Sequence, residues 1–84
     1  MDLVDRLDAV RTRDDLVGFL GEALADLSRG GPGWENTSLE EFLEALAAWL
    51  HDMPGVFANR GESVPNQPDW NLVARMIMAA RMYE

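Results

Sequence analysis

Cysteine and lysine are absent from the sequence, and histidine occurs once. Without cysteine the chain has no disulfide framework and no thiolate chemistry, and a secreted domain of this size would often need disulfides. The opening MDLVDRLDAV carries acids where a signal peptide has a basic start. No apolar run approaches the roughly 20 residues that a membrane-spanning helix requires. We therefore expect a cytoplasmic protein that does not associate with membranes.

Positive charge is also scarce. The 7 basic residues, all arginine, oppose 15 acidic residues, and the formal net charge is −8. Nucleic-acid binding needs a basic face, so it is disfavoured. The one nucleic-acid role that stays open is that of an acidic mimic of DNA. A basic protein partner is compatible with this charge. So is the simpler interpretation that acidity keeps a small protein soluble.

The chain has 84 residues, of which 48% are hydrophobic. This length predicts one domain over 1–84, and the apolar content argues against disorder. Such a domain buries a smaller share of its surface than a large one. Its few aromatic side chains are therefore expected to contribute to the core.

Helical spacing of apolar residues predicts a short N-terminal helix and then a helix over 13–28. The apolar stripe jumps by roughly 140° between Val10 and Leu16, at about 100° per residue, so the two helices must be separate. Thr12 is the expected N-cap of the second helix. The predicted core face of that helix consists of Leu16, Phe19, Leu20, Ala23 and Leu27.

The strongest amphipathic pattern predicts a helix over 38–53. Ser38 and Glu41 have the spacing of a capping box, and Pro54 with Gly55 is expected to end the helix. Its expected core face consists of Leu39, Phe42, Leu43, Leu46, Leu50 and Met53. A long loop over 54–67 should then follow. Apolar side chains of this loop are expected to hold it to the core, namely Val56, Phe57 and Val64.

A last helix is predicted over 68–83, with Pro68 in its first turn. Its apolar residues, Trp70 among them, cover an arc of roughly 220°, about twice the usual width, which predicts a central position. Met78 and Met82 fall on the remaining strip. They are expected either to fill gaps against the N-terminal helix or to form a contact face. The fold class is all-α: a small bundle of three main helices and a short N-terminal one.

No pattern in the sequence indicates catalysis, a metal site or a cofactor site. His51 shares one side of its helix with Glu44, but seven positions separate them by about 10 Å, too far to share one ion. Asp52 is expected to point elsewhere on the helix. No glycine-rich segment has the lysine of a phosphate-binding loop. The sequence therefore predicts that the protein is not an enzyme.

Trp34 stands in a glycine-rich loop just before a helix start. The favoured interpretation is that its ring folds back over the end of the core, while Asn36 makes a local turn bond before the cap. The alternative is an anchor that enters a partner's pocket, because tryptophan is enriched at binding hot spots.

The stretches WENTSLEEFLEALAAWLHDM and PDWNLVARMIMAARMYE resemble a family of short bacterial proteins of unknown function. The shared features are Trp-Glu-Asn at 34–36, the cap at Ser38, Leu-x-Ala-x-x-x-Trp at 43–49, Asn59 with Gly61, and an alanine-rich end over 79–84. The segment VFANRG departs from the pattern, where an aromatic pair is expected. The resemblance covers the chain from about Val10. It implies a small helical domain and brings no activity, catalytic residue or cofactor.

Two functions remain open on the sequence alone. The first is a protein-interaction module, such as an immunity or antitoxin-like protein, that binds a basic partner through its acidic helix face or its long loops. The candidate residues for it are Glu40, Glu44, Asp52, Phe57 and Arg60. The second is a structural homodimer or a subunit of a larger assembly, which would use Met78 and Met82.

Overall fold

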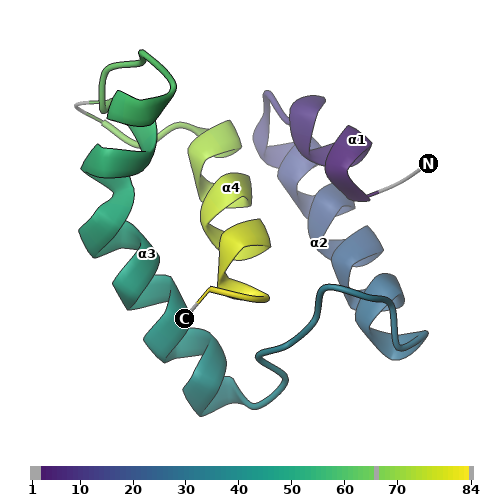
Figure 1. The fold of residues 1–84 in the computed structure, drawn as a ribbon. Coiled ribbons are helices and arrows are strands. Elements are labelled where there is room, and N and C mark those ends of the chain that lie inside the picture. Colours follow the sequence, from purple (N-terminus) through teal and green to yellow (C-terminus); the bar gives the residue numbers. More distant parts are fainter. Residues whose placement is uncertain (1–2, 66, 84) are drawn as a thin grey trace.

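Four helices make up the fold in the computed structural model, which describes residues 3–65 and 67–83. They are α1 (Leu3–Asp8), α2 (Arg13–Ser28), α3 (Leu39–Asn59) and α4 (Trp70–Ala80). α4 packs against each of the other three, whereas α2 and α3 share no packing contact within the described residues. Figure 1 shows α4 between α3 on one side and the α1–α2 pair on the other. The predicted all-α architecture with a central C-terminal helix is confirmed.

α2 has the bounds that the sequence predicts. The Thr12 side chain accepts a hydrogen bond from the Asp15 backbone N–H at 3.1 Å, and the Asp15 carboxylate accepts one from the Thr12 backbone N–H at 3.2 Å. Two of the open N–H groups at the helix start are thereby satisfied. At the other end Gly30 adopts φ 70°, a left-handed conformation that ends a helix at little cost when the residue is glycine.

α3 is longer than predicted, and the expectation that Pro54 and Gly55 end it is wrong. The helix continues through Pro54 to Asn59. Pro54 removes one backbone hydrogen bond, but Phe57 in the next turn is 3% exposed and fixes that turn in the core. Gly61, two residues beyond the helix end, stops it with φ 70°, and backbone N–H groups there return to the carbonyl groups of the last turn.

The long loop therefore starts after α3, and two of its three expected anchors are not in it. Val56 and Phe57 lie in α3 and face inward from there. Val64 does lie in the loop, but its side chain is exposed. The loop is thus shorter than predicted, because Val56 and Phe57 extend the helix, and Val64 does not anchor it in the core.

The predicted core face of α3 is wrong in part, since Met53 does pack against the second core cluster but several of its leucines are exposed. Ala45 and Trp49 are the buried residues in its first turns, while Leu39 is 73% and Leu43 is 54% exposed. The helix is rotated by roughly 60–90° from the prediction, at about 100° per residue. Trp49 explains the rotation, since a buried indole removes roughly 150–250 Å² from water, more than a leucine does.

α2 also buries a narrower face than predicted. Leu16, Phe19 and Ala23 are buried, but Leu20 and Leu27 remain substantially exposed and Leu24 is 65% exposed. The reason is the absence of a neighbour: α2 packs on α1 and α4 and, among the described elements, not on α3.

α4 begins later and ends earlier than predicted. Asp69 is its N-cap and accepts a hydrogen bond from the Leu72 N–H at 2.7 Å, so Pro68 precedes the cap instead of lying in the first turn. Trp70 follows at the very start of the helix and is 44% exposed, so its expected core burial is wrong. A helix end has neighbours on fewer sides than a helix middle.

The core divides into two clusters that meet at α4. The first joins α1 and α2 to Ala74 and Met78, and the second joins Trp49 and Phe57 of α3 to Leu72. Met78 is 9% exposed. It fills the gap beside α1, the first of the two alternatives for this residue, and offers little surface to a partner.

Candidate functional site

One apolar hollow of the surface follows from the missing contact between α2 and α3. It is a groove of about 360 Å³ bounded by α2, by the loop before α3 and by the first turn of α3, with Ile77 of α4 among its lining residues. We call it the α2–α3 groove. Its apolar lining comes chiefly from Leu20, Leu24, Leu27, Trp34, Leu39 and Phe42. Three of them, Leu20, Leu27 and Leu39, are leucines that the sequence assigned to the core and that the fold leaves at the surface.

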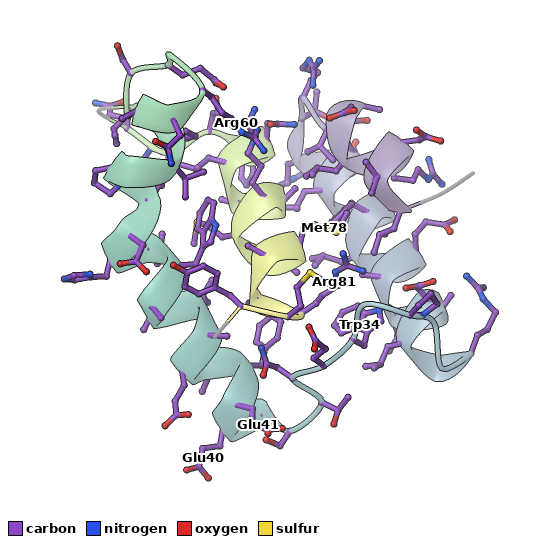
Figure 2. The ribbon with its side chains drawn as sticks, viewed as in Figure 1. Trp34, Glu40, Glu41, Arg60, Met78 and Arg81 are labelled. Carbon is purple, nitrogen blue, oxygen red and sulfur yellow. The ribbon has the colours of Figure 1, made fainter. Side chains whose placement is uncertain are left out.

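The lining of the α2–α3 groove carries no charged side chain within the described residues, whereas its border is acidic. Glu35 lies in the bordering loop, and Glu40 and Glu41 follow Leu39 in the first turn of α3, all exposed. Figure 2 shows Glu40 and Glu41 at this end of α3. An apolar floor with acidic edges suits a ligand that is itself apolar along one face and basic at its margins.

Trp34 forms one wall of the groove. Its ring packs against the first core cluster, and its Nε1–H donates to the Asp26 carboxylate at 2.8 Å. The guanidinium of Arg81 lies 5.6 Å from the ring centroid on its face. The prediction that the ring covers the end of the core is confirmed. The ring also lines the groove, so the structure does not exclude the anchor hypothesis.

Asn36 does not make the predicted local turn bond. Its side-chain amide donates to the Ala80 carbonyl at 3.1 Å and to the Tyr83 carbonyl at 2.9 Å. The backbone N–H groups of Glu35 and Asn36 both donate to the Arg81 carbonyl. The loop thus satisfies the open carbonyl groups at the end of α4. This fixes the position of the loop that borders the groove.

A second asparagine, which the sequence analysis missed, acts in the same way. The side-chain amide of Asn71 in α4 donates to the Leu7 carbonyl at 2.9 Å and to the Val10 carbonyl at 3.0 Å. It thereby holds the end of α1 against the start of α4. An asparagine on an otherwise apolar helix could have indicated a buried hydrogen bond from the sequence. It would not have identified the acceptor groups.

The three predicted acidic contact residues do not form one site. Glu40 and Glu44 are exposed on the first half of α3. Asp52 lies further along and accepts a hydrogen bond from the Tyr83 hydroxyl, with His51 Nδ1 at 3.2 Å from its other oxygen. The expectation that Asp52 points away from His51 is therefore wrong. All three side chains of this contact remain accessible to water, so it fastens the chain end to α3 and encloses no reaction site.

These contacts shift two pKa values. The hydroxyl of Tyr83, and secondarily His51, hold the pKa of Asp52 below its usual 3.8. The same hydrogen bond, with the nearby carboxylate charge, raises the pKa of Tyr83 above its usual 10.0. The hydrogen bond between Tyr83 and Asp52 is the largest cause of both shifts, and it requires an ionised Asp52 and a protonated Tyr83.

The other predicted contact residues lie apart from the α2–α3 groove. Phe57 and Arg60 line a different hollow, between α1 and α3, in which Met78 also takes part. Met82 is exposed just after the end of α4. The structure thus separates Met78 from Met82, which the sequence treated as one strip.

Among residues 3–65 and 67–83, no three His, Cys, Asp or Glu side chains gather closely enough to bind a metal ion. None of the described helices has both the length and the apolar character needed to cross a bilayer.

Comparison with known proteins identifies one family. The profile of a family of unknown function matches residues 12–84, nearly the whole span of the predicted resemblance. Glu84, the last residue of that resemblance, lies outside the described residues. No curated protein and no solved structure matches the chain. The match confirms the resemblance to an uncharacterised family, while the bacterial origin stays a prediction.

Proposed function

The chain belongs to the family of unknown function DUF7660, and from this premise, which brings no activity, we propose that the protein is a protein-interaction module. Its ligand is an amphipathic helix of another protein, apolar along one face and flanked by lysine or arginine, which lies in the α2–α3 groove. The observation that carries the proposal is the exposure of Leu24 and Leu39, 65% and 73%, on the two sides of one uncharged hollow.

The shape of the site favours a helix as the ligand. α2 and α3 both pack on α4 and leave the space between them open. A helix placed there would contact both and complete an arrangement of four helices around a common core. Its apolar residues would cover the leucines of α2 and α3 that intramolecular packing leaves exposed.

Charge favours another protein over a second copy of this chain. Each copy carries a formal net charge of −8, so two copies repel each other, most strongly at low ionic strength. A basic partner gains from the same charges, because Glu35, Glu40 and Glu41 border the groove. An immunity or antitoxin-like role is a narrower hypothesis of this kind, supported by size and charge alone.

Site-specific photocrosslinking in cells tests the proposal. A photoreactive benzoyl-phenylalanine replaces Leu24 in the groove or, as the matched control, Ala58, which is exposed on α3 away from it. We expect crosslinks at position 24 that are absent at position 58 and that map to a helical, basic-flanked segment of one protein. Leu24→Glu should then abolish binding of that segment as a synthetic peptide, while Ala58→Glu, with the same charge change, should leave it intact.

Three results would contradict the proposal. They are crosslinks at position 24 that map only to a second copy of the chain, equal crosslinking at both positions, and a captured segment that binds Leu24→Glu as well as the unmodified protein.

A further inference from the structure

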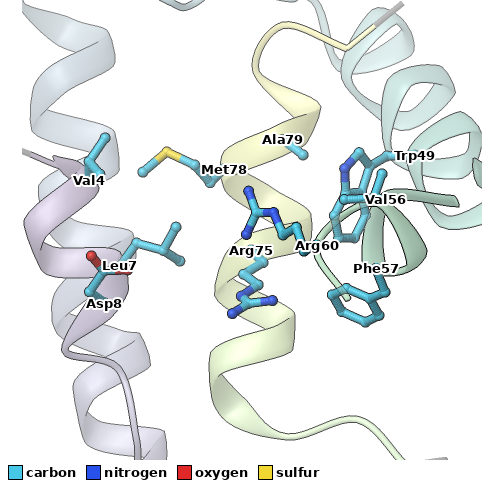
Figure 3. A pocket seen from close by; sticks show the side chains of 10 residues that line it. All are labelled: Val4, Leu7, Asp8, Trp49, Val56, Phe57, Arg60, Arg75, Met78 and Ala79. Atoms are coloured by element: carbon cyan, nitrogen blue, oxygen red, sulfur yellow. The ribbon is translucent and has the colours of Figure 1, made fainter. Parts of the chain in front are cut away.

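A second hollow lies on the other side of α4, between α1 and α3. It has a volume of about 290 Å³, and we call it the α1–α3 groove. Leu7 and Asp8 of α1 form one wall and Trp49 and Phe57 of α3 the other. Figure 3 shows the side chains of Arg60 and Arg75 between these walls. The groove therefore joins two cations to apolar and aromatic surface in a protein that is otherwise strongly acidic.

The arginines of this groove differ from most others in the chain. Four of the 7 basic residues have polar partners: Arg6 pairs with Glu22, Arg29 with Asp26, and Arg11 and Arg81 donate to backbone carbonyl groups. Within the described residues, Arg13, Arg60 and Arg75 have no hydrogen bond from the side chain and no ion pair. Two of these three line the same groove. Among residues 3–65 and 67–83, no acidic side chain pairs with their donors, although acidic residues outnumber basic ones twofold in the chain.

The walls restrict the kind of anion that fits. The guanidinium of Arg75 lies 5.7 Å from the ring centroid of Phe57, which holds it over an aromatic face. Trp49 and Met78 also line the groove, each with a small exposed part of an apolar side chain. A carboxylate suits the planar fork of an arginine, and a ring or branched chain suits the walls. Asp8 adds a negative charge that disfavours a doubly charged phosphate. The volume of about 290 Å³ lies just below the roughly 300–1,000 Å³ of ligand sites, so the ligand is small.

We propose that the α1–α3 groove binds a small monocarboxylate whose body is one aromatic ring or a branched aliphatic chain, with the carboxylate on Arg60 and Arg75. This site is independent of the proposed helix-binding groove. Arg75 and Ile77, which line the two grooves, are two positions apart on α4 and hence about 200° apart around it.

Titrating the isotope-labelled protein with phenylacetate, followed by NMR, tests the proposal. We expect saturable shifts at the indole N–H of Trp49 and at the backbone amides of Phe57 and Ala79, and no shifts at Leu24. Phenylacetamide keeps the ring and lacks the charge, so it should bind at least about tenfold more weakly, as expected for loss of charged hydrogen bonds. Phenyl phosphate should also bind more weakly than phenylacetate.

Arginine variants assign the binding to the groove. Arg60→Gln and Arg75→Gln should each weaken phenylacetate binding by about tenfold. Arg13→Gln is the matched control, because it removes the same charge from an exposed arginine at the start of α2, outside the groove. Arg75→Lys keeps the charge but loses the planar, two-donor guanidinium, so it should also weaken binding. It also serves as the test if Arg75→Gln fails to fold. Circular dichroism checks each variant.

The proposal is overturned if phenylacetate causes no saturable shift in the groove. It is equally overturned if the amide or the phosphate binds as tightly as the carboxylate, or if Arg13→Gln weakens binding as much as Arg60→Gln does. None of these outcomes bears on the helix-binding groove, which the substitution at Leu24 tests separately.

Discussion

Trp34 shows how much one partly buried side chain can hold together. It packs on the first core cluster, donates to Asp26 and lies under Arg81. We expect Trp34→Ala to lower the free energy of unfolding by about 2–4 kcal/mol, somewhat less than for a fully buried tryptophan. Urea denaturation followed by circular dichroism measures it. Trp70→Ala is the control, because Trp70 is 44% exposed. A near-neutral Trp34→Ala combined with loss of partner binding would favour the anchor hypothesis instead.

Tyr83 and Asp52 make stability depend on pH at both extremes. The folded pKa of Asp52 is lowered, so its contribution is present above pH 3.8 and is lost as the pH falls through the folded value. The folded pKa of Tyr83 is raised, so its contribution is present below pH 10.0 and is lost as the pH rises through the folded value. In Tyr83→Phe the pKa of Asp52 should rise toward 3.8, as an NMR titration of its carboxyl group would show. An unchanged Asp52 pKa would mean that the hydrogen bond does not form in solution.

At the residue scale the sequence predicts local contacts and not distant ones. The Thr12 and Ser38 caps follow from a spacing of three residues and are confirmed. Asn36 and Asn71 each join two carbonyl groups far away in the sequence. No short pattern encodes such a bond, because it depends on how whole helices pack. For the same reason, Phe57 and Arg60 were singled out from the sequence but Arg75, their neighbour in the α1–α3 groove, was not.

At the scale of the element, two glycines at the end of α3 should respond in opposite ways to alanine. Gly55 lies within the helix, and a Cβ added there meets open space. Gly55→Ala should therefore raise the free energy of unfolding by about 0.5–1 kcal/mol. Gly61 has φ 70°, so Gly61→Ala should lower it by about 1–2 kcal/mol. Thermal denaturation of both variants measures the difference. A destabilised Gly55→Ala would indicate that the helix ends at Pro54 after all.

α3 also shows why a helix can be found in the sequence while its orientation is missed. It carries two apolar stripes, one of leucines and one centred on Ala45 and Trp49. Periodicity counts apolar residues and cannot say which stripe meets the neighbouring helix. The leucine stripe is the longer, but the stripe that holds the indole is buried. The error matters for function, because Leu39 on the unburied stripe lines the α2–α3 groove.

At the scale of the whole molecule, charge should control self-association. At pH 7 and low salt we expect a monomer of 9.4 kDa by light scattering, because the formal net charge is −8. As the pH falls toward the pI of about 4.4, repulsion vanishes and the exposed leucines should promote association. Leu24→Glu should suppress that association and Ala58→Glu should not. A stable dimer at pH 7 that does not depend on salt would instead favour the homodimer hypothesis.

The order of the helices and the central place of α4 could be predicted from the sequence, because a wide apolar arc requires neighbours on several sides. The α2–α3 groove could not. It exists because α2 and α3, each with apolar side chains facing the groove, do not contact each other. Their separation is set by how each packs on α4. A groove that forms because two helices do not pack against each other has no sequence pattern of its own.

The central place of α4 has a consequence for biosynthesis. α4 follows the other three helices in the chain, and each of the three packs against it. Until α4 has left the ribosomal exit tunnel, α3 has no core to join and the carbonyl partners of Asn36 do not yet exist. A ribosome that stalls before α4 would therefore release a chain with unburied apolar surface, which chaperones and proteases recognise. The arrangement of the helices thus makes completion of α4 a condition for surviving cellular quality control.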